Sequence, residues 1–89
     1  LVCGSGTGMA IAANKVPGVR AAVAWNEETA RLARQHNDAN VLSIGARTTP
    51  EEEIPKIVRT WFATPFDGGR HAKRVEKIKE LESECGGQR

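Results

Sequence analysis

The stretch Leu1-Val2-Cys3-Gly4-Ser5-Gly6-Thr7-Gly8 decides the fold of this chain. A short apolar run ends in a cysteine, and three alternating glycines lead directly into residues 9–14, which favour a helix. A strand, a glycine-rich turn and a helix in this order are typical of α/β proteins, in which the turn presents backbone N–H groups to an anion. The same loop carries a thiol and two hydroxyls, so it combines an anion-binding backbone with a possible nucleophile or base.

The spacing of the glycines matches neither of the two common nucleotide-binding loops. Gly4, Gly6 and Gly8 spell G-x-G-x-G, whereas dinucleotide-binding proteins have G-x-G-x-x-G and P-loops have G-x-x-x-x-G-K-[ST]. The position about twenty residues further on, where an acidic residue would bind a ribose, holds Trp25 and Asn26. We therefore expect no nicotinamide cofactor. A plain tight turn, in which the glycines only relieve crowding, is the alternative for the loop taken by itself.

Length and composition limit the other possibilities. The chain has 89 residues, enough for one small domain, and its 39% hydrophobic and 27% charged residues are ordinary for a soluble globular protein. A net charge of +2 gives no reason to expect a nucleic-acid partner, and the longest apolar stretch, residues 21–25, is too short to cross a membrane. Cys3 and Cys85 form no disulfide framework, so we expect a cytoplasmic protein. The histidines and acids lack metal-ligand spacing, and we expect neither metal nor organic cofactor.

The hydrophobic pattern predicts alternating strands and helices. Strands are expected at residues 1–3, 18–25 and 41–45, and helices at 8–15, 27–36, about 50–62 and 70–84, with a frayed tail at 85–89. Such alternation with short loops indicates an α/β fold with a parallel sheet. The carboxyl ends of the strands, where ligands bind in such sheets, carry Cys3 with its loop, Trp25-Asn26 and residues 45–47. Because an apolar strand from residue 1 needs neighbours on both sides, we expect that earlier strands are absent from this chain.

Several residues are expected at particular places within the helices. Asn26 is a good N-cap for the second helix, which should bury Ala30, Leu32 and Ala33 and expose Arg34. Thr48 or Thr49 should cap the third helix, whose apolar face comprises Ile54, Ile57, Val58, Trp61 and Phe62, and Pro55 should kink it or delay its start. The last helix has only a narrow apolar stripe of Val75, Ile78 and Leu81, which suits a helix lying across another subunit.

Three groups of residues could carry chemistry. Cys3 lies at the mouth of a helix N-terminus, where it could act as nucleophile or base, although a lone cysteine is more often a small buried hydrophobe. His36 could transfer protons next to Asn37, but the two could equally form a helix end with Asn37 in the left-handed conformation. Arg70 and Arg74 share one helix face and could bind a phosphate together, or form a solvated basic surface. A surface or supporting position is expected for His71.

These motifs together resemble one family. Residues 3–15, residues 34–42, and Gly68-Gly69-Arg70-His71 followed by Arg74 are similar to ribose-5-phosphate isomerase type B, a family that includes the galactose-6-phosphate isomerase subunits. The resemblance extends from residue 1 to about residue 81. It implies a Rossmann-like three-layer α/β/α sandwich, a single partial domain at 1–84, and a helix 70–84 at a dimer interface. The family's N-terminal third, with an Asp-His pair of the sugar-phosphate site, has no counterpart here.

The resemblance also implies a role for each candidate residue, in an active site built where two subunits meet. Cys3 corresponds to the base that moves a proton between the first two sugar carbons, and Met9 stands where relatives without this cysteine have a glutamate. His36 corresponds to the group that opens the furanose ring. The remaining implied contacts are Ser5 as a proton shuttle, Gly4, Gly6, Thr7 and Gly8 as the anion hole, Asn37 as a substrate contact, and Arg70 and Arg74 as the phosphate grip.

The leading expectation is therefore an isomerase that interconverts ribose 5-phosphate and ribulose 5-phosphate, assembled as a homodimer or a dimer of dimers. One alternative keeps the mechanism but acts on a six-carbon sugar phosphate such as allose or galactose 6-phosphate. The Gly68-Gly69-Arg70-His71 motif favours the ribose type. The other alternative is an inactive, truncated dimerisation fragment, and we expect the 89-residue chain by itself to be weakly active or inactive.

Overall fold

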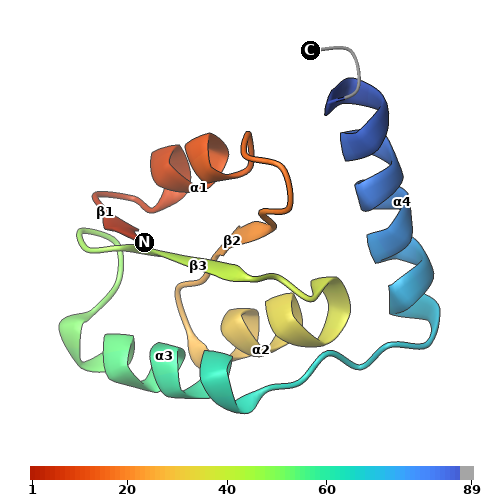
Figure 1. Ribbon diagram of the computed structural model, residues 1–89. Coiled ribbons are helices and arrows are strands. Elements are labelled where there is room, and N and C mark those ends of the chain that lie inside the picture. The colour runs from red at the N-terminus through yellow and green to blue at the C-terminus, as the bar shows by residue number, and fades with distance from the viewer. Residues whose placement is uncertain (87–89) are drawn as a thin grey trace.

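The computed structural model describes residues 1–86, which form three short strands, four α-helices and one 3-10 turn (Figure 1). In chain order these are β1 (Val2–Cys3), α1 (Thr7–Ala13), β2 (Ala21–Val23), α2 (Glu27–Asn37), β3 (Val41–Gly45), the 3-10 turn η1 (Glu51–Glu53), α3 (Ile54–Ala63) and α4 (Arg70–Gly86). The predicted alternation of strands and helices is confirmed throughout.

The sheet is parallel, and β3 lies at its centre between β1 and β2. Cys3 is paired with Gly45, and Val23 is paired with Ser43, so the carboxyl ends of all three strands meet at one edge. Helix α1 covers one face of the sheet, and α2 and α3 cover the other (Figure 1). The predicted three-layer α/β/α arrangement is therefore confirmed.

The hydrophobic core lies between the sheet and the α2–α3 layer. Ile57 is fully buried and Trp61 is nearly so, and both pack against a set of small side chains: Ala24, Ala30, Ala33 and Ala39, with Ile44. The alanines let α2 approach α3 closely. Two predicted core residues are wrong, because Leu32 is 38% exposed and Phe62 is 83% exposed. Leu32 lies about 200° around the helix from Ala30, so both cannot face the sheet.

The predicted helix starts are confirmed for α2 and corrected for α3. The Asn26 side chain accepts a hydrogen bond from the Thr29 N–H at 2.8 Å, and the Thr29 hydroxyl oxygen accepts one from the Asn26 N–H at 3.3 Å, which forms a capping box. Neither Thr48 nor Thr49 caps the next helix, because the Thr48 hydroxyl hydrogen-bonds the Gly45 carbonyl and Thr49 is buried. Helix α3 starts late, after η1, as the proline at its first turn predicts.

Helix α4 is the least covered element. Val75 is buried, but Ile78 is 42% and Leu81 is 61% exposed, so most of its apolar stripe lacks a partner within residues 1–86. Both carboxylate oxygens of Glu82 accept from the Gly18 N–H at 2.9 Å, which ties the far half of α4 to the body. The helix runs to Gly86, two residues past its predicted end, and the rest of the predicted tail, 87–89, lies outside the described residues. Within residues 1–86, no helix is apolar over enough of its length to cross a bilayer.

Strand β1 is less enclosed than its sequence suggests. Within residues 1–86 it pairs with β3 alone, and Val2 is 66% exposed. The expectation of further strands beside β1 stays a prediction.

Candidate active site

The glycine loop is fixed tightly against the end of β3. Gly6 is the N-cap of α1 with a φ of 81°, and the buried hydroxyl of Ser43 donates to its carbonyl at 2.6 Å. A Cβ at Gly6 would lie 3.0 Å from the Gly45 nitrogen. Both the left-handed backbone and the close approach therefore require glycine here.

A pocket of about 560 Å³ opens at the carboxyl edge of the sheet. It is lined by Ser5, Thr7, Val23, Ala24, Trp25, Gly45, Thr48, Thr49 and Pro50. The Ser5 hydroxyl accepts from the Thr7 N–H at 3.3 Å, and Cys3 is half-buried at the start of the same loop. The first N–H groups of α1 have no carbonyl partners within the helix, as at any helix N-terminus. The structure thus brings together the three strand ends that the sequence predicts.

Two polar groups at this edge were not predicted as site residues. The Arg47 N–H donates to the Gly4 carbonyl at 2.9 Å, and the Arg47 side chain lies 3.7 Å from where a Cβ on Gly4 would be. It places a cation beside the loop. The hydroxyl of Thr49 is buried on the pocket wall without a hydrogen-bond partner among residues 1–86. The signal for both was their position directly after the carboxyl end of β3.

A second cluster forms where the end of α2 meets the start of α4. The rings of His36 and His71 stack with centroids 4.2 Å apart and planes 11° apart. His71 is only 8% exposed, and its Nδ1 has no hydrogen-bond partner in the described part of the chain. The sequence allows either a surface or a supporting position for His71, and its burial agrees with the supporting one. Arg70 and Arg74 flank it from the same helix.

Burial and the neighbouring charges disfavour protonation of the His71 imidazole. Burial lowers the pKa of His71 below its ordinary value of 6.5, and the electrostatic interactions with His36, Arg70 and Arg74 lower it further. Asp67 acts in the opposite direction. This end of the molecule is therefore a positively charged surface next to a ring whose protonation is disfavoured, which suits an anion.

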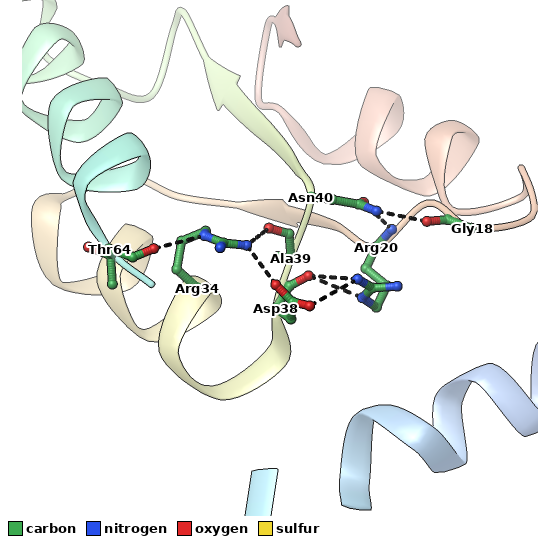
Figure 2. A network of polar contacts seen from close by, with 7 residues as sticks. All are labelled: Gly18, Arg20, Arg34, Asp38, Ala39, Asn40 and Thr64. Atoms are coloured by element: carbon green, nitrogen blue, oxygen red, sulfur yellow. Dashed lines mark hydrogen bonds and ion pairs between the residues drawn. The ribbon is translucent and has the colours of Figure 1, made fainter. Parts of the chain in front are cut away.

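The end of α2 is held by the polar network in Figure 2. Asp38 takes the left-handed conformation after the helix, with a φ of 46°, and not Asn37, for which the sequence left this conformation open as one alternative. The Asp38 carboxylate accepts from Arg34 at 3.0 Å, and its carbonyl accepts from Arg20 at 2.9 Å. Aspartate tolerates this backbone and adds two ion pairs, which explains why the turn falls one residue later. Asn37 ends the helix and is exposed.

Arg34 also corrects a prediction, because it is half-buried rather than outside. Its guanidinium donates to the carbonyls of Ala39 at 2.7 Å and Thr64 at 3.1 Å and lies 5.9 Å above the ring of Trp61. One side chain thus links α2, the turn into β3 and the segment after α3 (Figure 2). The long, polar-ended side chain of arginine can lie over an apolar core and still reach its partners.

The segment between α3 and α4 places the start of α4 beside His36. The Asp67 N–H donates to the Gln35 carbonyl at 3.1 Å, which fastens the segment to the last turn of α2. Gly68 and Gly69 follow with φ values of 70° and 57°. Two successive left-handed residues turn the chain sharply into α4, and glycine adopts that conformation without steric cost.

His36, Asp67 and His71 hold potential metal-ligand atoms within 4.8 Å of one another. The two rings are nearly parallel, whereas the nitrogen lone pairs lie in the ring planes, so an ion shared by both rings would lie well outside at least one plane. Arg70 and Arg74 add positive charge close by. The geometry and charge of this cluster fit an anion better than a metal ion.

The two clusters lie at opposite edges of the sheet. Cys3, Ser5 and the glycine loop are at the carboxyl edge. His36 and Asn37 lie at the end of α2, just before β3 begins, with Arg70 and Arg74 beside them at the start of α4. Figure 1 shows the same separation, with the β1–α1 turn at one end of β3 and the start of α4 beyond the other. A single chain therefore assembles each half of the predicted site and does not join them.

A parallel three-layer sandwich with a glycine loop at its carboxyl edge and a basic cluster at the other edge defines the class of this protein: a Rossmann-like α/β fold. Residues 1–78 match the model of the Ribose/Galactose Isomerase family. The chain belongs to this family.

Individual relatives agree with this assignment. Ribose-5-phosphate isomerase B of Escherichia coli is 48% identical over 82 residues, which cover 92% of this chain and 55% of that protein. The solved structure of Clostridium thermocellum ribose-5-phosphate isomerase B is 52% identical, with a TM-score of 0.92 over 94% of this chain and 57% of that one. The Mycoplasma genitalium enzyme, solved with bound ribulose-5-phosphate, is 49% identical, with a TM-score of 0.92 over 94% of this chain and 55% of that one. The chain thus spans about half the length of these relatives.

Proposed function

We propose that this chain is part of an aldose–ketose isomerase that interconverts ribose 5-phosphate and ribulose 5-phosphate. The observation that carries the proposal is the similarity over 94% of the chain to a structure that holds ribulose-5-phosphate. The two half-sites supply what the reaction needs, which is a base at carbon, stabilisation of an oxyanion and an anchor for the phosphate.

At the carboxyl edge, the Cys3 thiolate takes the proton from C2 of the open-chain aldose. The electron pair moves into the C1–C2 bond and onto O1, which gives an enediolate. Backbone N–H groups of the loop from Gly4 to Gly8 stabilise this negative charge. The Ser5 hydroxyl moves a proton between the two oxygens, and the thiol then returns its proton to C1. No step requires a metal ion or an organic cofactor.

The other half of the site comes from a second copy of the chain. Its His36 opens the furanose ring by proton transfer, Asn37 contacts the sugar, and Arg70 and Arg74 bind the phosphate with charge-assisted hydrogen bonds. A homodimer, or a dimer of dimers, supplies this partner. The exposed Ile78 and Leu81 support a second subunit lying against α4.

The test is an isomerase assay on the full-length protein, with ribose 5-phosphate as substrate and EDTA present. Formation of ribulose 5-phosphate, followed by NMR, is the expected result. Greater turnover of allose or galactose 6-phosphate would replace the substrate assignment and keep the mechanism. A stable dimer with no turnover, whose melting temperature sugar phosphates do not raise, would overturn the proposal.

The 89-residue chain assayed alone should be weakly active or inactive, because it lacks a counterpart to the Asp-His pair that the resemblance implies. Its cysteines, Cys3 and Cys85, are both free within the described residues. Free thiols fit a reducing compartment, and we propose the cytoplasm.

A further inference from the structure

We propose that His71 is a positioning residue whose ring holds the imidazole of His36 in the orientation that the sugar requires. This inference rests on the proposed function in one respect, namely that His36 acts on the substrate. His71 itself touches the substrate in no step, and its effect passes through the ring of His36.

The geometry of the pair supports this role. The two rings stack with centroids 4.2 Å apart and planes 11° apart. His36 is half-buried in the last turn of a helix, where a side chain without a neighbour samples several rotamers. His71 is buried and belongs to the first turn of α4. Its backbone N–H donates to the Gly68 carbonyl at 3.1 Å. The more rigid ring thus limits the motion of the more exposed one.

The hydrogen bonding of the His71 ring also supports the positioning role. Its Nδ1 is buried and has no hydrogen-bond partner in residues 1–86, although such atoms are normally satisfied. The flat face of the ring is engaged with His36. The face, rather than the nitrogen, therefore carries the interaction that keeps this side chain in place.

The charges that face His71 favour a neutral ring under His36. Arg70 and Arg74 approach from its own helix and His36 from α2, and Asp67, in the segment before α4, is the one carboxylate of residues 1–86 that acts on it. A neutral aromatic face can stack on an imidazole in either protonation state, and its attraction to an imidazolium is of the cation–π kind. A second cation at this position would repel His36 whenever His36 carries a proton.

The test compares His71→Phe with His71→Leu in the full-length protein. Phenylalanine keeps a flat ring, whereas leucine fills the space without one, so both should fold. NMR of the His36 ring protons, assigned by their loss in His36→Asn, reports the stack directly. We expect the upfield ring-current shift in the native protein and His71→Phe, and its loss in His71→Leu.

Kinetics complete the test. Loss of the ring should lower kcat about 10–100-fold and change KM less than about threefold, because misplacing a reacting group costs rate more than binding. His71→Phe should stay within about threefold of the native kcat. Val75→Ala, which loosens the packing of α4 without removing a ring, is the matched control and should keep the shift.

Two results would overturn the proposal. One is native kcat in His71→Leu with the ring-current shift lost, and the other is equal loss of kcat in both His71 variants with the shift retained in His71→Phe. Full isomerase activity of His36→Asn would instead overturn the catalytic role of His36. The ring-current shift would still report whether His71 holds His36, so the two failures are distinguishable.

Discussion

Cys3 and His36 lie at opposite edges of one parallel sheet, Cys3 where β1 ends and His36 in the last turn of α2. From its first residue to its last, β3 covers four steps of about 3.3 Å, which separate these edges by about 13 Å. An extended pentose phosphate is shorter than this distance. If both residues act on one substrate molecule, they must come from different copies of the chain.

Subunit complementation tests this directly. Cys3→Ala removes the base of one half-site, and Arg70→Ala weakens the phosphate anchor of the other. When activity is assayed at a substrate concentration far below the KM of Arg70→Ala, a mixed dimer of the two variants therefore contains one intact site and one doubly defective site. Random reassembly of equal amounts should restore about one quarter of native activity, because half of the dimers are mixed and each has one good site of two. Isomerase assays before and after mixing measure it. No recovery in mixed dimers, verified by mass spectrometry, would contradict the two-copy site.

Cys3 itself should affect chemistry and not binding. Removal of a general base costs about 10²–10⁴ in rate. Cys3→Ala in the full-length protein should therefore lower kcat by this factor, while the Kd for ribulose 5-phosphate changes less than about threefold, since the arginines are untouched. Calorimetry gives the Kd. Cys85→Ser, at an exposed position of α4, is the control and should retain activity. Parallel loss of rate and affinity would indicate a structural thiol.

The arginines should show the opposite pattern. Arg70→Ala or Arg74→Ala should weaken binding of the sugar phosphate by about 2–4 kcal/mol, the usual cost of removing a charged, hydrogen-bonded anchor. The effect should appear mainly in KM. Lys73→Ala, an exposed cation between them in sequence, controls for general charge and should change KM little. A similar rise of KM in all three variants would mean that the basic surface acts only by its total charge.

The glycine loop offers a matched pair of variants for stability. Gly6 has a φ of 81°, and a Cβ added there would lie 3.0 Å and 3.2 Å from backbone atoms of Gly45 and Ile44. Gly6→Ala should therefore destabilise the fold by about 1–3 kcal/mol. Gly8 lies inside α1 with nothing within 4 Å of where its Cβ would be, and Gly8→Ala should leave stability unchanged or raise it by up to about 1 kcal/mol. Denaturant unfolding distinguishes the two. Equal effects would mean that the loop is not held against β3 as described.

The sequence sufficed for the layers of the fold and for the edge where the strands end, because both follow from local periodicity and from the parallel order of the chain. The position of Arg34 could not be predicted in this way. A charged side chain is expected on the exposed face of the helix. Instead, the Arg34 guanidinium lies over Trp61 and donates to carbonyls that the tertiary fold brings together. The turn at Asp38 depends on the same distant partners, including Arg20.

Local motifs name the candidate site residues one by one, but they do not give the contacts between those residues within one chain. Cys3 with its loop and Arg70 with Arg74 stand out as local motifs. The stack of His36 on His71 joins residues 35 positions apart, and it depends on how Gly68 and Gly69 turn the chain into α4. The separation of the two half-sites likewise follows from the path of α2 back across the sheet, which no motif encodes.

His71 should make the stability of the protein depend on pH. Its pKa in the folded protein lies below the ordinary value of 6.5, because burial and the nearby positive charges disfavour the imidazolium. The unfolded chain therefore binds more protons than the folded one as the pH falls through and below about 6.5. The stability that His71 contributes is complete above this range and is lost as the pH falls toward its folded pKa.

The measurement is the melting temperature of the full-length protein between pH 7.5 and pH 5.5. The native protein should lose more stability over this range than His71→Phe, whose ring does not titrate. All other groups, His36 and Asp67 included, are present in both proteins, so the difference between the two curves reports the titration of His71 together with its coupling to His36. Parallel curves would show that the imidazole at residue 71 takes up a proton equally readily in the folded and unfolded states.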